Sequence, residues 1–200
     1  MINSDLYLTI ETSSTAEYKE KGSKFLAFSF PVENEIQIKE LLSEFRKKYY
    51  DARHVCHAYI LGTENRIMKG NDDGEPSHTA GTPILNQIRS KNLTNVLVIV
   101  VRYFGGTKLG VSGLIEAYKE SAKDCLDQAI IVERFVYQTI RVAFQATIQG
   151  EVMRFIKEFE ANILSMDYDN GIVMTVQVRK SRVNSFASKP IQGMEVSVID

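Results

Sequence analysis

The stretch VLVIVVRYFGGTKLGVSG, residues 96–113, joins a strand, a glycine-rich turn and the start of a helix. Val96–Val101 is apolar at every position, which is typical of a strand that is covered on both faces of a sheet. We therefore expect this strand in the middle of a sheet, or in its most buried row. Beyond Gly110, one helical stripe is predicted. Its apolar and small residues are Leu114, Ile115, Ala117, Tyr118, Ala122, Cys125 and Leu126.

The residues before this stretch alternate between strand and helix patterns. Ser23–Val32 predicts a strand, and residues 33–50 carry apolar side chains at helical spacing. Val55–Leu61 and Arg66–Gly70 follow as two further expected strands. Thr79–Lys91 then predicts a helix that leads to the buried strand. Helices and strands are therefore mixed in this part of the chain.

Beyond residue 130 the expected order is β-α-β-β-α-β, the arrangement of a ferredoxin-like unit with two helices on one face of an antiparallel sheet. We place a domain boundary near residues 130–133, which gives domains at 1–130 and 131–200. The fold class is thus α+β with two domains. The expected elements are strands at 134–144, 163–168, 172–178 and 194–199, helices at 151–159 and 181–188, and a hairpin turn at Asp169-Asn170-Gly171.

The composition is that of a globular protein, with 44% apolar and 24% charged residues in a chain of 200. A formal net charge of −1 argues against a protein that coats nucleic acid. Val96–Val101 is the longest aliphatic run and is far shorter than the ~20 residues that span a bilayer. The N-terminus has no cationic region leading into an apolar stretch. We expect a cytoplasmic protein with no membrane partner.

The segment around His57 is the first of three that are rich in reactive side chains. Period-two alternation places His57 and Tyr59 on one face of the expected strand and Cys56 on the other. A single metal ion cannot easily use both His57 and Cys56, and the other cysteine, Cys125, lies far along the chain. We therefore expect no metal site and no cofactor, and a buried structural role for both cysteines.

A second segment, NDDGEPS at residues 71–77, gathers Asp72, Asp73 and Glu75. One interpretation is a polar turn whose carboxylates are neutralised by Arg53 or Arg102. The other is general acid/base catalysis or Mg²⁺ binding. Both interpretations require a positive group near the acidic segment.

The third segment is the glycine-rich turn before the last helix of the first domain. Glycines let backbone N–H groups approach a ligand, and a helix N-terminus favours anions. The turn lacks both the Walker A pattern and the dinucleotide fingerprint. An anion-binding loop and a purely structural turn therefore both remain open. The candidate anion-binding residues are Arg102, Gly105, Gly106, Thr107, Lys108, Gly110 and Ser112.

Together, the segments HVCHAYILG (54–62), NDDGEPSHTAGTPIL (71–85) and VIVVRYFGGTKLGVSGLIEAY (98–118) resemble the YigZ/Impact family, in its bacterial two-domain form. The resemblance implies a first domain similar to the second domain of a ribosomal small-subunit protein. It implies a second domain similar to the last, ferredoxin-like domain of elongation factor G. One departure is His78, where members usually carry glycine; the substitution is strained if that position needs a positive φ.

The resemblance also bears on function. Eukaryotic Impact proteins regulate translation by binding the activator of a stress kinase, and a bacterial two-domain member need not share that partner. We therefore carry two hypotheses. The first is a translation-associated regulatory protein that contacts RNA or the ribosome through Arg102, Lys108 and the glycine-rich turn, and a protein partner in translation control is a further expectation. The alternative is a hydrolase that uses His57, Asp72, Asp73 and Glu75.

Overall fold

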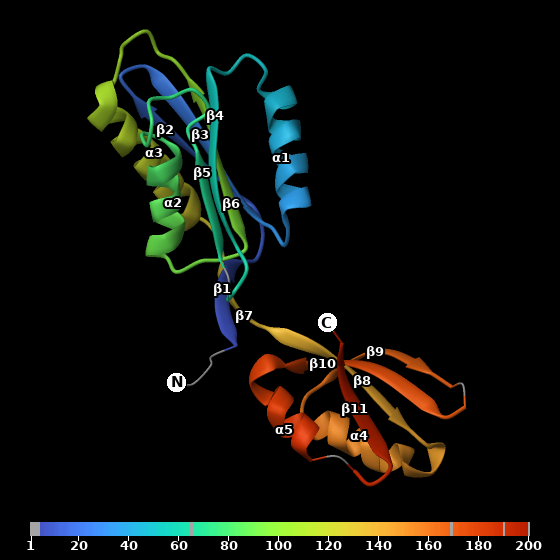
Figure 1. Ribbon diagram of the computed structural model, residues 1–200. Helices are drawn as coiled ribbons and strands as arrows, with labels where there is room; N and C mark the ends of the chain where they lie inside the picture. Colours follow the sequence, from blue (N-terminus) through green and yellow to red (C-terminus); the bar gives the residue numbers. More distant parts are fainter. Residues whose placement is uncertain (1–4, 65, 169, 190, 200) are drawn as a thin grey trace. The chain divides into compact units, whose positions relative to one another are not determined.

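The computed structural model describes residues 5–64, 66–168, 170–189 and 191–199. The chain has a mixed α+β structure and divides into two compact units (Figure 1). One unit comprises Leu8–Arg134, and the other comprises Phe135 onward together with the N-terminal segment up to Tyr7. In the described part of the chain, no helix combines the length and apolar character needed to cross a membrane.

The first unit is built on a five-stranded sheet in which neighbouring strands are antiparallel. In spatial order its strands are β2 (Ser14–Glu20), β3 (Ser23–Pro31), β6 (Val96–Tyr103), β4 (His54–Leu61) and β5 (Ile67–Asn71). The central strand, β6, pairs with β3 and β4 and is buried from Val96 to Arg102. The expectation of a central, doubly covered strand is confirmed.

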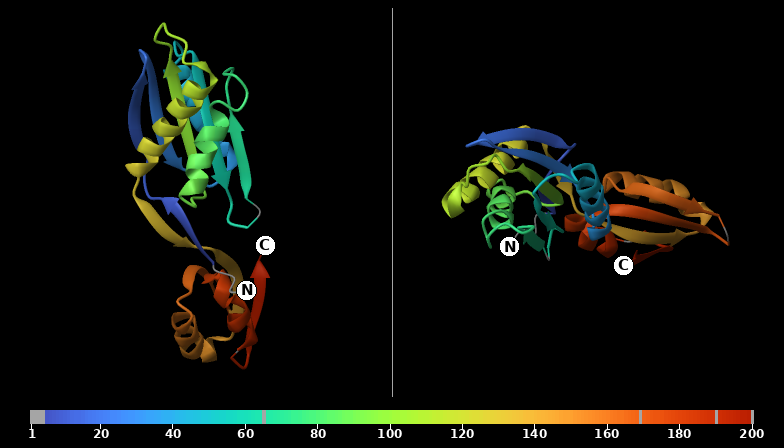
Figure 2. Two further views of the ribbon diagram at one scale, coloured as in Figure 1. Left: turned by 90° about the vertical axis from the view of Figure 1, so that its left-hand side faces the viewer. Right: turned by 90° about the horizontal axis from the view of Figure 1, so that it is seen from above.

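Three helices cover the two faces of this sheet. Helices α2 (Gly81–Ser90) and α3 (Gly110–Asp127) lie on one face, and α1 (Glu35–Lys48) lies on the other (Figures 1 and 2). Strand β4 divides its side chains between the two resulting cores. Cys56 packs on the α2/α3 side and Tyr59 on the α1 side, as the alternation predicts.

The second unit follows the order β8 (Tyr137–Phe144), α4 (Gln149–Glu158), β9 (Asn162–Asp167), β10 (Ile172–Arg179), α5 (Val183–Ser188) and β11 (Met194–Ile199). Its antiparallel sheet has the spatial order β11-β8-β10-β9. Phe155 of α4, Phe159 directly after it and Phe186 of α5 form one aromatic cluster in its core. Asp169 of the expected hairpin turn lies outside the described residues.

Two strands were missed by the sequence patterns and one expected strand was wrong in its extent. Strands β1 (Leu6–Ile10) and β2 were not expected, and β2 has no fully buried residue to mark a face. The expected strand at 134–144 is split into β7 (Ile131–Phe135) and β8 at Val136, whose N–H bonds to the carbonyl oxygen of Asp5. β7 pairs with β1 in a separate two-stranded sheet.

Candidate functional site

Asp72 caps the N-terminus of helix α2 from a distance. Its Oδ1 accepts hydrogen bonds from the N–H groups of Ala80 (2.9 Å) and Gly81 (2.8 Å). Its Oδ2 accepts from the N–H of His78 (2.9 Å). Burial opposes ionisation, but these donors outweigh it and lower the pKa of Asp72 below its ordinary value. Asp72 therefore holds the acidic segment against the start of α2.

Asp73 is held by the backbone of β4 and by helix α1, on the face of the sheet away from α2. Its Oδ2 accepts a hydrogen bond from the N–H of Val55 (2.7 Å), and its Oδ1 forms an ion pair with Arg46 (2.6 Å). Burial raises the pKa of Asp73, and these two donors more than reverse the effect, so the pKa lies below its ordinary value. The positive partner of Asp73 is thus Arg46, from the last turn of α1, and neither of the two arginines expected from the sequence.

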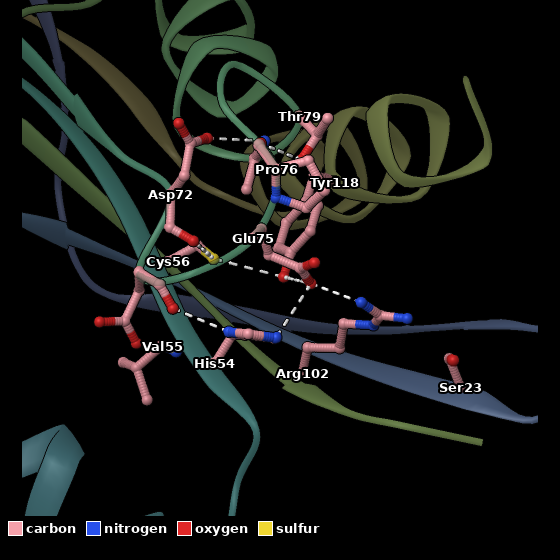
Figure 3. A network of polar contacts seen from close by, with 12 residues as sticks. Ser23, His54, Val55, Cys56, Asp72, Glu75, Pro76, Thr79, Arg102 and Tyr118 are labelled. Carbon is pink, nitrogen blue, oxygen red and sulfur yellow. Dashed lines mark hydrogen bonds and ion pairs between the residues drawn. The ribbon is translucent and has the colours of Figure 1, made fainter. Parts of the chain in front are cut away.

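Glu75 is the centre of a buried polar network (Figure 3), with a side chain only 3% exposed. Its Oε1 accepts hydrogen bonds from Arg102 Nη1 (2.5 Å) and from the hydroxyl of Tyr118 (2.9 Å). His54 Nε2 lies 3.8 Å from the same oxygen. His54 Nδ1 lies 2.7 Å from the carbonyl oxygen of Asp73, so this nitrogen carries the proton. The expectation that Arg102 neutralises the acidic segment is confirmed for Glu75.

Cys56 closes the network on the side of α2. Its sulfur lies 3.1 Å from the carbonyl oxygen of Asp72 and 3.3 Å from the hydroxyl oxygen of Tyr118, and its single S–H can donate to either of them. Burial raises the pKa of the Cys56 thiol far above its ordinary value, and it likewise raises the pKa of Tyr118. Both cysteines are free and buried, which confirms the burial expected of them.

His57 lies apart from this network. It lines a pocket on the α1 side of the sheet together with Glu35, Tyr59 and Lys69. Burial and the nearby Arg46 lower the pKa of His57 to about 4, so its ring is neutral at pH 7. The structure therefore does not bring His57 to the carboxylate of Glu75, and His54 occupies that place.

The carboxylates of Asp72, Asp73 and Glu75 are each held by internal donors, which favours the structural interpretation of the acidic segment. Within the described ranges, no group of three or more His, Cys, Asp or Glu side chains is arranged to hold a metal ion. The sequence patterns missed two members of the network, His54 and Tyr118, although each leaves a signal in the sequence. Alternation along β4 places His54 on the face of Cys56, and the hydroxyl of Tyr118, in a buried helical stripe, needs a partner.

The glycine-rich turn, residues 105–109, follows Phe104 and leads from β6 to α3, and the chain is exposed from Phe104 to Lys108. Gly105 N–H donates to Ser23 Oγ (3.2 Å), which fixes the turn against the β2–β3 hairpin. Gly106 and Gly110 adopt φ values of +86° and +74°. These are left-handed conformations that favour glycine.

The candidate anion-binding residues divide into two groups. Thr107, Lys108 and Ser112 are exposed, and the Leu109 side chain that precedes α3 offers no cap to its first turn. Arg102 is only 5% exposed and points inward to Glu75. The exposed turn and the first turn of α3 are therefore the parts of this site that an anion can reach.

His78 adopts a φ of +65°, so the family's usual glycine would be unstrained at this position. The ring Nδ1 lies 3.2 Å from Thr82 Oγ1. We expect His78→Gly to have a higher free energy of unfolding than His78→Ala by about 1 kcal/mol. Both variants lose the ring contact, and only alanine keeps a Cβ in the left-handed region. Urea unfolding followed by circular dichroism measures the difference. Equal stabilities of the two variants would contradict a strained backbone at residue 78.

Three comparisons with known proteins cover the chain. A family model for the Impact N-terminal domain matches residues 21–126. The chain is 31% identical over 181 residues to the IMPACT family member YvyE of Bacillus subtilis, covering 90% of this chain and 83% of that protein. It is 27% identical over 173 residues to the IMPACT family member YigZ of Escherichia coli, covering 84% of each chain. A solved structure described as that of a hypothetical protein shares the fold, with a TM-score of 0.72, 23% identity and 98% coverage of both chains.

Proposed function

Because the chain belongs to the Impact family, as its three segments indicate, we propose that it is a translation-associated regulatory protein of the cytoplasm. It acts by binding rather than by catalysis, and it contacts RNA, free or within the ribosome, through the glycine-rich turn. A protein partner in translation control fits the same role. The proposal extends to this chain what is expected of the family, and its molecular basis is the exposed turn.

The observation that carries this proposal is the exposed turn before α3. The backbone is open to solvent at Gly106, where an added Cβ would meet nothing within 4 Å, and Lys108 supplies a positive charge beside it. No side-chain hydrogen bond caps the first turn of α3. The backbone N–H groups of a first helical turn point out of its N-terminal end, where the helix dipole stabilises anions. This combination suits a phosphate group.

Arg102 has an indirect role in this proposal. Its guanidinium holds Glu75 and lies 5.9 Å from the ring of Phe104, so it fixes the base of the turn. Lys108, Thr107, Ser112 and the backbone N–H groups make the contact with the anion.

The proposal includes the folds of both domains. The β11-β8-β10-β9 order, with α4 and α5 packed on one sheet, supports a ferredoxin-like fold for residues 131–200, similar to the last domain of elongation factor G. Residues 1–130 take the fold of the second domain of a ribosomal small-subunit protein. A net charge of −1 fits a specific or transient contact better than tight coating of RNA.

Salt dependence of RNA binding tests the proposed contact. A single-stranded RNA is titrated with the protein at roughly 50 to 200 mM salt, and binding is followed by fluorescence anisotropy. We expect Lys108→Ala to weaken binding and to reduce the slope of log K against log salt by about 0.7, the value of one phosphate contact on a single strand. Lys39→Ala, on the exposed side of α1, is the matched control. A slope unchanged in Lys108→Ala would contradict the proposal.

A further inference from the structure

Phe104 is a large apolar side chain placed at the surface beside the glycine-rich turn. It is 51% exposed, and it directly follows the buried strand β6. The Cζ atom of Arg102 lies 5.9 Å from the centre of its ring, and Arg102 is itself anchored by Glu75. The ring is therefore supported from within the protein while half of its surface faces solvent.

A depression of about 750 Å³ opens beside this ring. Its lining residues are Asp51, Ala52, Arg53, His54, Asp73, Tyr103 and Phe104. Internal hydrogen bonds hold its walls: the Tyr103 hydroxyl donates to Asp51 Oδ1 (2.9 Å), and Arg53 N–H donates to the carbonyl oxygen of Arg102 (3.0 Å). The volume falls in the range of sites that receive small aromatic ligands.

The depression and the glycine-rich turn offer different chemical groups to a ligand. The depression is lined by the carboxylate of Asp51, whose Oδ1 accepts from the Tyr103 hydroxyl, and by Arg53, so it offers an acceptor and donors to the edge of a nucleobase. Phe104 and Tyr103 offer aromatic surface on which a base can stack. The turn that begins at the next residue, Gly105, carries the positive charge of Lys108. The depression therefore suits a base, and the adjacent glycine-rich turn suits the phosphate of the same strand.

We propose that the depression beside Phe104 receives an unpaired nucleobase of the RNA strand whose phosphate binds the glycine-rich turn. This inference rests on the proposed function and adds the class of partner, single-stranded rather than double-stranded RNA. A base within a duplex is stacked on both faces and its pairing edge is occupied, so it cannot enter the depression. An unpaired base can stack on Phe104 and place its edge against the polar lining.

The test compares one RNA of about ten nucleotides, as a single strand and annealed to its complement, by fluorescence anisotropy with the full chain. We expect the protein to prefer the single strand. Phe104→Ala lowers the affinity for the single strand roughly 5- to 150-fold, the effect of losing one stacked base, and leaves duplex binding unchanged. Phe104→Tyr keeps the aromatic ring and retains the preference. Circular dichroism melting verifies that each variant is folded.

Lys108→Ala separates the two proposals. It weakens binding of both RNAs, because both carry phosphates. If Phe104→Ala binds the single strand as tightly as the wild type, or weakens both RNAs equally, the base-binding inference is overturned. A continued effect of Lys108→Ala then still supports the proposed function. If the wild-type protein binds neither RNA, both proposals are overturned.

Discussion

Gly105→Ala is expected to lower the free energy of unfolding by roughly 3 kcal/mol or more, or to prevent the first unit from folding. A Cβ at this position would lie 1.8 Å from the carbonyl carbon of Gly22 and 2.1 Å from the backbone nitrogen of Ser23. These are backbone atoms of the β2–β3 hairpin, so the clash is not relieved by rotating a side chain. The φ of Gly105 is not left-handed, so the effect is one of space alone.

Two other glycines provide controls for this effect. A Cβ at Gly106 meets nothing within 4 Å, but its φ is +86°, so Gly106→Ala is expected to cost about 1 kcal/mol. Gly150, in α4, has neither a close neighbour nor a left-handed φ, and alanine there is expected to stabilise by roughly 0.5–1 kcal/mol. Urea unfolding measures all three. A Gly105→Ala variant as stable as Gly106→Ala would contradict the close packing of the turn on the hairpin.

Glu75→Ala is expected to lower the free energy of unfolding by about 3–5 kcal/mol. The substitution removes the carboxylate that accepts from Arg102 and Tyr118, and it leaves the guanidinium of Arg102 buried without its charge partner. An uncompensated buried charge is far more costly than the loss of the pair itself. Urea unfolding followed by circular dichroism measures the loss.

A double variant tests the coupling. Glu75→Leu with Arg102→Met replaces both charges with apolar side chains, and we expect it to be more stable than either single substitution. Leaving a single buried charge is the main cost, and the double variant leaves neither. If the losses of the two single variants simply add in the double variant, Glu75 and Arg102 are not energetically coupled, contrary to the geometry in Figure 3.

Local sequence patterns predicted the elements whose apolar residues are themselves buried in the core. The unbroken apolar run of Val96–Val101 predicted the central strand, and alternation placed Cys56 and Tyr59 on opposite faces of β4. β2 was missed because its alternation is weak: only Ala16 and Tyr18 mark its inner face, and neither is fully buried. The break at Val136 was missed because its cause, the carbonyl oxygen of Asp5, lies far away in the sequence.

The candidate site was predicted in outline and not in its pairings. The sequence indicated that the acidic segment needs a positive partner, and Arg102 fills that role for Glu75. The partner of Asp73, Arg46, lies on a helix from the other side of the sheet, so only the tertiary structure brings the two together. His54 was passed over for His57 because the histidine that reaches Glu75 depends on which face of β4 meets the acidic segment.

Co-sedimentation with purified ribosomes and ribosomal subunits, at roughly 50 and 150 mM salt, tests most directly whether the glycine-rich turn contacts RNA in translation. We predict that the wild-type protein pellets with ribosomal particles and does so less at the higher salt. A smaller fraction of Lys108→Ala pellets at each salt concentration, because one phosphate contact is lost, and Lys39→Ala pellets like the wild type. Absence of the wild-type protein from every pellet, or equal pelleting of Lys108→Ala, would contradict the account.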